Sequence, residues 1–462
     1  MARIPQPSEY RPAPEILAIA DILGDAVSPA RFPAHILRFR NDRWAGTVGL
    51  DTLDEARWVA HFGRFEPLPG NLPEPLALRY HGHQFRSYNP DIGDGRGFLF
   101  AQLRDHENRL LDLGTKGSGR TPYSRFGDGR LTLKGGVREV LATEMLEALG
   151  VETSKSFSLI ETGEALQRND EPSPTRSAVL VRLSHSHIRI GSFQRLAALG
   201  EMEALSRLVD YCLVQYYADE AGEDGPARLL DHAVRETARL AASYLASGFV
   251  HGVLNSDNIA ITAESFDYGP WRFTPYWDPG FVAAYFDHAG LYAFGRQAQA
   301  IHWDVAQLAI ALRTIAPVET LLPILESFPT QFEQRLHQAL VNRLGVTGGD
   351  ALLGEAIMAA LAEGRVPIDR FFFDWRGGVL RDPEQAGDRY DSPAFDAFRQ
   401  LVSPHANSTL TAHAYWQDRE PCSMHIDEVE AIWARIDADD DWSAFDRKIA
   451  AIRRMGEAMR LR

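Results

Sequence analysis

The chain contains 462 residues, a length that allows about three domains or one large domain with insertions. Hydrophobic residues make up 45% and charged residues 24% of the sequence, which are ordinary values for globular proteins and exclude disordered, collagen-like and coiled-coil chains. The 48 Lys and Arg residues against 63 Asp and Glu residues leave a net charge of −15, which disfavours a protein that coats nucleic acid or anionic membrane but allows a local basic pocket.

Residues 1–75 are expected to form an N-terminal arm and a packing segment. Residues 1–30 are proline-rich and lack the basic start and apolar stretch of a secretory leader, whereas 32–78 carry recurring aromatic residues between turn signals. No window of the chain is long and apolar enough to cross a bilayer, and two cysteines, Cys212 and Cys422, are too few for a disulfide framework. We therefore expect a soluble, cytoplasmic monomer that binds neither nucleic acid nor membrane.

Residues 76–192 have the composition of a glycine-rich β-sheet with one helix. Glycines cluster in DIGDGRG (91–97), GTKGSGR (114–120) and GDG (127–129), with short apolar runs between them. An apolar stripe predicts a helix over Gly136–Leu149, ended by a glycine at its C-terminal cap. The runs SFSLIE and SAVLVRLS that follow predict two strands.

The rest of the chain predicts helices. One is expected over Phe193–Ala218 and another over Pro226–Ser247, and WDVAQLAIALRTI, ETLLPILESF and ALLGEAIMAALAEG continue the pattern. A small sheet lobe followed by a larger helical lobe is the order of protein-kinase-like folds. We predict an α+β, two-lobed fold with a β-rich lobe over 76–192, a helical lobe over 193–345 and a helical C-terminal extension over 346–462.

The run GFVHGVLNSDNIAIT, followed by FDYGP, carries the chemistry. Protein kinases place a His-Arg-Asp loop after a helix, a metal-binding Asn seven residues beyond the His, and then an Asp-Phe-Gly turn whose Asp also binds metal. Here Asn258 follows His251 by seven residues, and Asp267 begins a DYG turn nine residues later. An amide and a carboxylate suit Mg²⁺ or Mn²⁺, which prefer oxygen ligands and leave room for phosphate oxygens. Val253 replaces the kinase catalytic Asp, and Asp257 is the nearby carboxylate.

Two upstream residues complete the pattern of a nucleotide site. Lys116 follows the apolar run LLDL, where a strand lysine contacts phosphates, and Glu139 lies 23 residues later, where its partner belongs. Glu139 falls nearly opposite the apolar stripe, so periodicity alone predicts a solvated side chain. Only the pairing with Lys116 indicates that this face lines a cleft. Order and spacing together favour a kinase-like nucleotide site over unrelated surface charges and turns.

Other kinds of site are less well supported. Two H-x-H pairs, His81 with His83 and His185 with His187, could bind zinc from one face of a strand. No Cys or carboxylate stands at ligand spacing, so ordinary hydrogen-bonded histidines are the preferred interpretation. A G-x-x-x-x-G-K-[ST] loop is absent, and GDGRG lacks the helix pattern that follows a dinucleotide-binding turn.

These motifs resemble a known family, the selenoprotein O family of kinase-like protein adenylyltransferases. The resemblance runs from LRFRNDRW at 37–44 to AIHWDVAQLA at 300–309. It passes through LPGNLPEPLALRYHGHQF, NPDIGDGRG, GTKGSGRTPYSR, GDGRLTLKGGVRE, LVRLSHSHIRIGSF and HGVLNSDN…DYGPW…YWDPGF. Members of this family lack the usual kinase catalytic Asp and bind ATP turned around, so that AMP passes to a protein hydroxyl. Val253 agrees with that pattern.

The resemblance implies a role for each matching residue. Asp257 would be the catalytic base, and Asn258 with Asp267 would hold Mg²⁺ or Mn²⁺. Arg182 and Arg189 would neutralise the outward phosphates of ATP, since guanidinium groups hold phosphate oxygens bidentately. The remaining nucleotide-binding positions are Gly93, Gly95, Arg96, Lys116, Asp128, Gly129 and, as the partner of Lys116, Glu139.

The chain departs from the family pattern in two places. It ends RRMGEAMRLR, whereas many members carry a selenocysteine or cysteine close to the C-terminus, so redox control through a terminal thiol is in doubt. The stretch GEALQRNDEPSPT at 163–175 also differs from the usual Tyr-Arg-Glu and Glu-Pro-Gly-Ala stretch of the family, which changes the neighbourhood of Arg182.

The expected function is metal-dependent transfer of AMP from ATP to Ser, Thr or Tyr hydroxyls of proteins, with release of pyrophosphate. Transfer of UMP stays open on the same residues. A kinase that transfers the γ-phosphate is disfavoured by Val253, and a catalytically silent nucleotide-binding scaffold is disfavoured by Asp257 directly beside Asn258.

Overall fold

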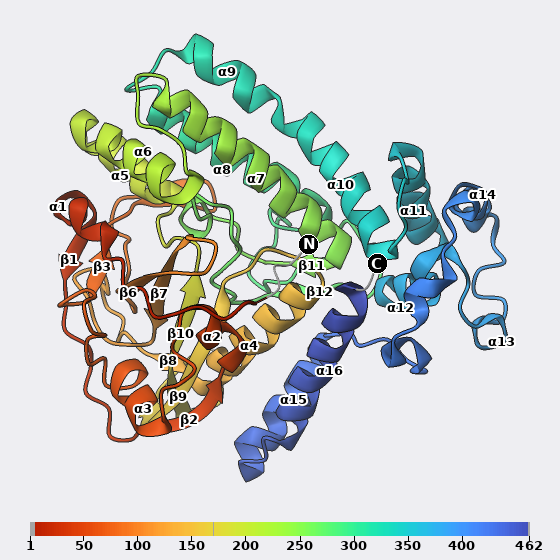
Figure 1. Cartoon of the computed structure of the whole chain (residues 1–462), viewed down its shortest axis with the longest axis horizontal. Coiled ribbons are helices and arrows are strands. Elements are labelled where there is room, and N and C mark those ends of the chain that lie inside the picture. The colour runs from red at the N-terminus through yellow and green to blue at the C-terminus, as the bar shows by residue number, and fades with distance from the viewer. Residues whose placement is uncertain (1–4, 170, 461–462) are drawn as a thin grey trace.

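A computed structural model describes residues 5–169 and 171–460. These residues form an α+β structure, as predicted, in which an antiparallel sheet lies at one end and helices occupy the rest (Figure 1). The first four residues of the predicted arm and the last two residues of the chain lie outside the described part. No helix in the described part is long and apolar enough to cross a membrane.

The main sheet pairs its strands antiparallel throughout. Across the described sheet the order is β1 (Gly24–Ala26), β3 (Leu76–Leu78), β6 (Leu99–Arg104), β7 (Leu110–Lys116), β10 (Thr175–Ser184), β9 (Lys155–Leu166) and β2 (Ile36–Arg40), with β8 (Leu131–Thr132) paired to β10. Strands β6, β7, β9 and β10 confirm the predicted glycine-rich sheet and its two long strands. The first and last strands of this order come from the predicted N-terminal arm and packing segment, so those segments belong to the sheet.

Helices cover both faces of the sheet because successive side chains of a strand point to opposite sides. Leu111 packs in a cluster with residues of α2 (Asp42–Thr47) and α3 (Glu55–Phe62). The neighbouring Leu110 packs on the other side, in the cluster that contains α4 (Leu133–Ala148).

The strand register places two cations on the α4 side of the sheet. Lys116 at the end of β7 pairs with Leu180 of β10, and Arg182 lies two residues further along β10. Paired residues and residues two apart share a face, so Lys116 and Arg182 point the same way. Helix α4 begins at Leu133, three residues before the prediction, because the Thr132 hydroxyl accepts the N–H of Gly135 at 3.1 Å and caps the helix.

The helices that follow agree with the predicted pattern, with one correction. The stretch predicted as a single helix over Phe193–Ala218 is two helices, because Gly200 adopts a left-handed φ of +74° and ends the first of them. The other predicted helices are present. The described helices are α1 (Ala20–Leu23), α5 (Ile190–Leu199), α6 (Met202–Tyr217), α7 (Gly225–Ser247), α8 (Gln297–Leu312), α9 (Val318–Glu326), α10 (Phe328–Leu344), α11 (Ala351–Gly364), α12 (Ile368–Asp374), α13 (Pro383–Ala386), α14 (Asp396–Val402), α15 (Ile426–Asp439) and α16 (Ser443–Arg460).

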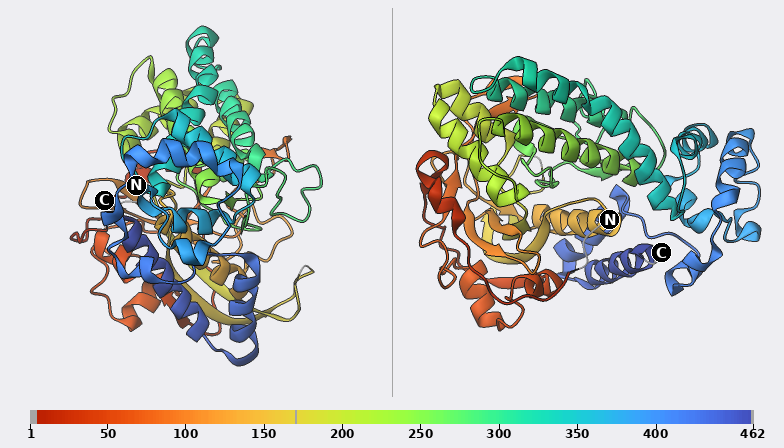
Figure 2. Two further views of the ribbon diagram at one scale, coloured as in Figure 1. Left: turned by 90° about the vertical axis from the view of Figure 1, so that its right-hand side faces the viewer. Right: turned by 45° about the horizontal axis from the view of Figure 1, so that its top comes forward.

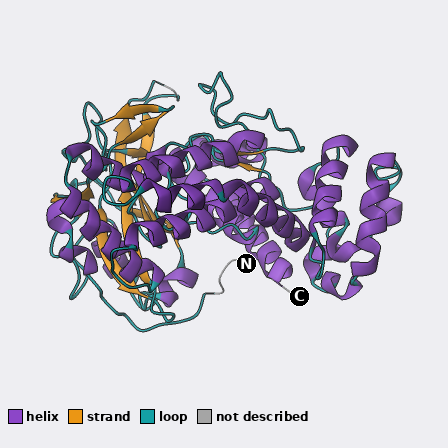
Figure 3. Ribbon diagram, turned by 90° about the horizontal axis from the view of Figure 1, so that it is seen from above, coloured by secondary structure: helices purple, strands orange, loops and turns teal. Residues whose placement is uncertain are grey.

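The C-terminal helix returns to the sheet end of the molecule. Figure 2 shows α16 beside α4, and Arg453 of α16 binds Glu144 of α4 through two hydrogen bonds of 2.8 Å. Helices α11 to α14 instead pack in a separate hydrophobic cluster with α10, at the end of the molecule away from the sheet (Figure 3).

Two short strand pairs complete the fold. Strands β4 (Gly82–Gln84) and β5 (Ser87–Asn89) form a hairpin, and β11 (Phe249–Val250) pairs with β12 (Arg272–Phe273). The β11–β12 pair frames the segment that contains Asp257 and Asp267, and so it sets the two ends of the candidate catalytic segment.

Candidate active site

A cavity of about 710 Å³ lies between the glycine-rich loops and the segment that carries Asp257 and Asp267. Its volume lies within the range of roughly 300–1,000 Å³ that small-molecule sites occupy. Ten of the twelve predicted site residues line it: Gly93, Gly95, Arg96, Lys116, Asp128, Gly129, Arg182, Arg189, Asp257 and Asp267. The other two, Glu139 and Asn258, adjoin lining residues, because Glu139 binds Lys116 and Asn258 follows Asp257.

Lys116 is the centre of a buried cluster of charges. Its Nζ contacts Glu139 Oε1 and lies 2.7 Å from Asp267 Oδ1, and Arg182 Nη1 lies 3.6 Å from the same oxygen. Glu139 is only 1% exposed, so the solvated side chain that periodicity indicated is wrong. The reason is that α4 is enclosed by strands β8, β9 and β10, by α15 and α16, and by the segment after Asp267, whose Gly269 and Trp271 carbonyls accept hydrogen bonds from Arg138.

The cations around Asp267 control its charge. Burial alone would raise the pKa of Asp267, but Lys116, Arg182 and Arg189 outweigh burial and hold this pKa well below its usual range. Asp267 also adopts a φ of +63°, which is uncommon outside glycine and typical of functional segments. The carboxylate is therefore ionised and held in a fixed position.

Arg189 connects the sheet with the segment that carries Asp257. Its Nη1 donates to the backbone carbonyl of Asp257 at 2.8 Å, its Nη2 donates to Asp94 Oδ1 at 3.3 Å, and its guanidinium lies 4.4 Å from the ring centre of Tyr80. The Nε of Arg189 and the Nε and Nη1 of Arg182 are buried without a hydrogen-bond partner. Buried donors without partners are costly and uncommon, so these nitrogens indicate where an anion would bind.

Asp257 lines the cavity and has one buried carboxylate oxygen without a hydrogen-bond partner. It lies in a short 3₁₀ turn, Ser256–Asn258, is 7% exposed, and its Oδ1 has no hydrogen-bond partner. Burial raises its pKa to about 6, so it is mostly ionised at neutral pH and yet basic enough to accept a proton. Gly82 of β4 allows this approach, since a Cβ there would lie 3.0 Å from Asp257 Cβ.

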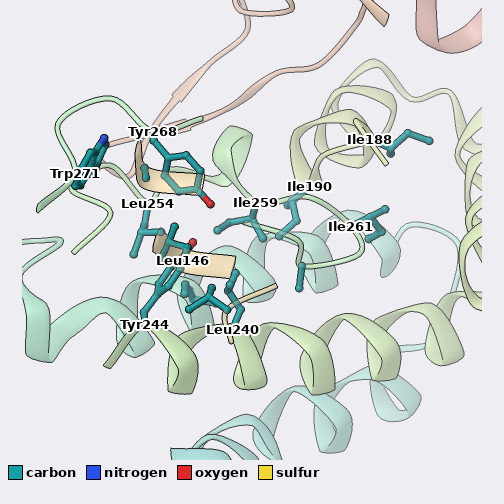
Figure 4. Close-up of a cluster of buried hydrophobic side chains, with 14 of the residues drawn as sticks. Leu146, Ile188, Ile190, Leu240, Tyr244, Leu254, Ile259, Ile261, Tyr268 and Trp271 are labelled. Atoms are coloured by element: carbon teal, nitrogen blue, oxygen red, sulfur yellow. The ribbon is translucent and has the colours of Figure 1, made fainter. Parts of the chain in front are cut away.

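The segment around Asp257 is fixed by hydrogen bonds of His251 and by burial of its flanking apolar side chains. The His251 N–H donates to Gln297 Oε1 at 3.0 Å, and the ring of His251 donates from Nε2 to the carbonyl of Phe266 at 2.9 Å. Leu254 and Ile259, on the two sides of Asp257 in sequence, are buried in the hydrophobic cluster of Figure 4 together with residues of α7. The turn that presents Asp257 is thus rigidly supported.

Asn258 and Asp267 have the chemistry of ligands for a hard cation. Asn258 Nδ2 donates to the carbonyl of Val253 at 3.1 Å, and this contact does not use the Oδ1 of the amide. An amide oxygen and an ionised carboxylate fit Mg²⁺ or Mn²⁺. Within the described residues no group of three or more His, Cys, Asp and Glu side chains is placed to hold a metal. Phosphate oxygens and water would therefore supply the remaining ligands.

Comparison with known proteins decides the family. Residues 8–453 match the sequence model of the family described as Protein adenylyltransferase SelO. The chain belongs to this family. It is 43% identical to Protein nucleotidyltransferase YdiU of Gloeobacter violaceus, over 96% of this chain and 95% of that protein, and 40% identical to the Synechocystis sp. protein of the same name, over 95% and 96%. The Azotobacter vinelandii protein of that name is 38% identical over 83% of this chain and 76% of its own length.

The glycine-rich loops of this SelO-family chain fold closely around Tyr123. A Cβ on Gly93 would lie 2.5 Å from the Tyr123 ring, and a Cβ on Gly95 would lie 3.0 Å from the Tyr123 carbonyl. The Tyr123 hydroxyl in turn donates to Asp25 of β1. The N-terminal strand therefore supports the wall of the cavity.

Several residues that line the cavity were not predicted as site residues, among them Asp94, Gln84, Phe126 and Arg168. Asp94 binds Arg189, and it was available from the sequence because it lies inside the GDGRG motif. Gln84 of β4 lines the cavity beside Asp257. Phe126 and Arg168 line its outer part, and no sequence signal marked them, because Arg168 lies in the stretch that departs from the family pattern.

The H-x-H histidines are hydrogen-bonded side chains, as preferred from the sequence. His81 Nδ1 lies 2.7 Å from the Tyr88 hydroxyl, and His83 Nδ1 lies 2.8 Å from Gln194 Nε2. His187 Nδ1 lies 3.0 Å from Ser184 Oγ. These contacts hold the β4–β5 hairpin and the end of β10 in place.

Proposed function

We propose that this chain transfers AMP from ATP to Ser, Thr or Tyr hydroxyls of proteins, with Mg²⁺ or Mn²⁺ and with release of pyrophosphate. Membership in the SelO family supports the reaction class. The observation that carries the proposal is that Asp257, which has a buried carboxylate oxygen without a hydrogen-bond partner, lines the same cavity as Arg182 and Arg189, which have buried guanidinium nitrogens without one. A base and an anion-binding group are thereby brought to one site.

The cations would bind and orient the triphosphate. Lys116 is held by Glu139, and the guanidinium groups of Arg182 and Arg189 have nitrogens free for phosphate oxygens. Guanidinium groups bind phosphate bidentately and with charge-assisted hydrogen bonds. Because these groups are already fixed by packing, they stabilise developing charge without reorganisation during the reaction.

Asp257 would act as the base. Its carboxylate would accept the proton of the acceptor hydroxyl as the hydroxyl oxygen bonds to the α-phosphorus, and the bond from the α-phosphorus to the bridging oxygen would break to release pyrophosphate. Asn258 and Asp267 would hold the metal ion, which neutralises phosphate charge when bound. The positioning of ATP and hydroxyl within one enclosed site supplies the remaining rate enhancement.

The finer organisation is part of the same proposal. We infer a kinase-like β-rich lobe over 76–192 and a helical lobe over 193–345, flanked by the segments 1–75 and 346–462. The site between β7, β10 and the Asp257 segment agrees with such a division. We also propose a cytoplasmic location, which its two free cysteines support because reduced thiols are usual in that compartment, and a monomeric state.

ATP labelled at the α-phosphate, compared with ATP labelled at the γ-phosphate, tests the proposal. Dephosphorylated casein and the chain itself serve as acceptors, with Mg²⁺ or Mn²⁺ present. Label on protein from the α position alone is expected. Label from the γ position alone would show a kinase, no label from either would show a silent scaffold, and greater transfer from α-labelled UTP would show a uridylyltransferase.

Replacing the base gives the matching prediction. Asp257→Asn keeps the shape of the side chain but removes its basicity, so transfer should fall by about 10²–10⁴-fold. Binding of ATP, measured by calorimetry, should change little because the phosphate-binding cations are intact. Transfer at the wild-type rate in this variant would disprove the assignment of Asp257.

A further inference from the structure

The exposed aromatic side chains of this chain gather around the candidate site. Within the described residues, the Phe and Tyr side chains that are at least 38% exposed all lie on three segments: the β4–β5 hairpin, the glycine-rich loop at 120–130, and the loop at 274–296 between β12 and α8. They are Phe85, Tyr88, Phe126, Tyr276, Tyr285 and Phe286. The hairpin and the glycine-rich loop each contribute residues to the cavity wall. Aromatic residues are enriched in protein interfaces, so this distribution indicates a contact surface beside the site.

Four rings form one cluster, which we call the aromatic patch: Phe85, Tyr285, Phe286 and Tyr292. The ring centre of Phe85 lies 5.9 Å from that of Phe286 and 5.2 Å from that of Tyr292, and Tyr285 lies 5.1 Å from Phe286. Tyr292 is buried, whereas Tyr285 is 79% exposed. Several exposed rings in contact with one another, unlike a single apolar side chain, are typical of a surface that binds a partner.

The turn that carries Phe85 is unusual. Strands β4 and β5 are joined by two residues, Phe85 and Arg86, whose φ angles are +49° and +63°. Two-residue hairpin turns with positive φ at both positions strongly favour Asn and Gly, because larger side chains are strained there. Strained residues of this kind are typical of functional sites. The exposed ring of Phe85 is therefore kept at the tip of the hairpin at a conformational cost.

The long loop of the aromatic patch is fixed in place. Residues 274–296 contain a single 3₁₀ turn near their end and are otherwise irregular, and long irregular loops in compact domains are usually functional. The Asp287 carboxylate accepts the N–H groups of Leu291 and Tyr292, each at 2.8 Å. An ordered surface loses less conformational entropy when it binds a partner.

The aromatic patch is joined to the turn that carries Asp257. Asn255 Oδ1 accepts the Phe85 N–H at 3.0 Å and the Tyr292 hydroxyl at 2.6 Å. Gln84, the neighbour of Phe85, lines the cavity together with Asp257. Asn255 precedes Asp257 by two residues, and a chain spans at most about 3.6 Å per residue, so the patch lies within a few residues' reach of the proposed base.

We propose that the aromatic patch binds an extended segment of the acceptor protein, in which an apolar side chain stands within a few residues of the hydroxyl that receives the nucleotide. The proposal rests on the proposed function and names its acceptor class. Asp257 is only 7% exposed, so a hydroxyl on a flat, folded surface does not reach it, whereas an extended segment does. The rings of the patch are uncharged, and an apolar side chain that packs on them is removed from water.

Two short fluorescein-labelled peptides test the proposal. Each carries one central Ser, which is flanked by Leu residues in one peptide and by Asn residues in the other. Their dissociation constants are measured by fluorescence anisotropy without nucleotide, so that no group is transferred. The Leu peptide should bind the wild-type chain about tenfold more tightly than the Asn peptide, because burial of a Leu side chain favours binding by about that factor or more.

Phe85→Ala combined with Phe286→Ala removes the patch. This double variant should lose the preference for the Leu peptide, while its calorimetric affinity for ATP with Mg²⁺ should stay within about twofold of wild type, as is usual for surface substitutions. The hydrogen bond from Phe85 to Asn255 comes from the backbone and is kept. Leu352→Ala is the control, because Leu352 is 56% exposed on α11, away from the sheet, and should leave both peptide affinities unchanged.

Transfer to a protein gives a second readout. With α-labelled ATP and dephosphorylated casein, the double variant should raise the KM for casein several-fold and leave kcat nearly unchanged, since the patch contributes binding that is the same before and during the reaction. Absence of α-label transfer to any acceptor would overturn the proposed function. The peptide affinities would still test the patch, because they do not depend on which group is transferred.

Equal affinity of the wild-type chain for the two peptides would overturn the inference. So would a double variant that keeps the preference for the Leu peptide, or the same loss of affinity in Leu352→Ala. Light scattering covers the other occupant: a wild-type chain that dimerises, together with a double variant that stays monomeric, would assign the aromatic patch to a second copy of this chain.

Discussion

At the scale of single residues, the site is a set of buried charges that satisfy one another incompletely. Lys116, Glu139 and Asp267 form a closed cluster, and this pairing offsets the large cost of removing each charge from water. Among the described site residues, the buried atoms without a hydrogen-bond partner include Asp257 Oδ1, Glu139 Oε2, Arg182 Nε and Nη1, and Arg189 Nε. Paired charges therefore build the scaffold, and the unpartnered donors of the two arginines lie where we propose that phosphate binds.

Lys116→Met tests the scaffold. It leaves two carboxylates buried without their cation, and breaking a buried pair costs about 3–5 kcal/mol, so the free energy of unfolding should fall by that order. Adding Glu139→Gln should restore part of the stability but none of the transfer activity, since the phosphate-binding ammonium is still missing. Chemical denaturation and α-label transfer measure the two effects. Recovery of activity in the double variant would contradict the role of Lys116.

Gly129→Ala tests the glycine-rich loop. Gly129 has a φ of +71°, and a Cβ there would lie 2.2 Å from the carbonyl oxygen of Gly119, so we expect a loss of about 1–2 kcal/mol from the left-handed conformation and further distortion from the clash. The KM for ATP should rise more than kcat falls. Gly150→Ala is the control, because Gly150 has a φ of +84° with nothing within 4 Å of its Cβ. Equal KM values in both variants would show that the loop tolerates the change.

At the scale of elements, α4 connects the site with helix α2 near the start of the chain and with helix α16 at its end. Its Glu139 holds Lys116, and its Glu144 binds Arg453 of α16. Its Glu147 accepts hydrogen bonds from the Trp44 ring and from Arg43 of α2. One helix thus positions Lys116 on one side and binds α2 and the C-terminal helix α16 on another, which explains why most of α4 is buried.

Glu147→Gln tests this connection, because it should change how the free energy of unfolding depends on pH. Burial acts to raise the pKa of Glu147, but Lys155, Arg43 and the Trp44 N–H outweigh it and lower the pKa below its ordinary value. A lowered pKa stabilises the fold above the ordinary carboxyl pKa, and this contribution is lost as pH falls through the folded-state value. The variant should be about 1–3 kcal/mol less stable than wild type at pH 7, with the difference shrinking below pH 4. A difference independent of pH, or one matched by Glu333→Gln on exposed Glu333 of α10, would contradict this account.

At the scale of the whole molecule, an acidic protein encloses a cationic cavity. The net charge of −15 describes the surface, whereas Arg96, Lys116, Arg182 and Arg189 all line the site. The two thiols have no part in it. Cys212 is fully buried, and Cys422 lies beside α15 and α16 with its pKa raised to about 11 by burial.

Thiol titration tests whether both cysteines are free, unreactive thiols. Neither cysteine should react quickly with Ellman's reagent at pH 8 in the native protein, because Cys212 is fully buried and the raised pKa of half-buried Cys422 keeps its thiol protonated; two should react in denaturant. The melting temperature should be the same with and without a reducing agent. Fewer than two reactive thiols in denaturant, or a melting temperature that falls on reduction, would show a disulfide that the described structure lacks.

The sequence by itself determined the family, the α+β class and ten cavity-lining positions, because these follow from local spacing: glycines, helix caps and the intervals between His251, Asn258 and Asp267. Only the tertiary structure decided which charges are buried. Glu139 is enclosed although its helix period indicated solvent, and Arg168 reaches the cavity from a hairpin that no motif marked. The physical reason is that periodicity describes one element at a time, whereas burial and ion pairing depend on strand register and on which distant segments pack against that element.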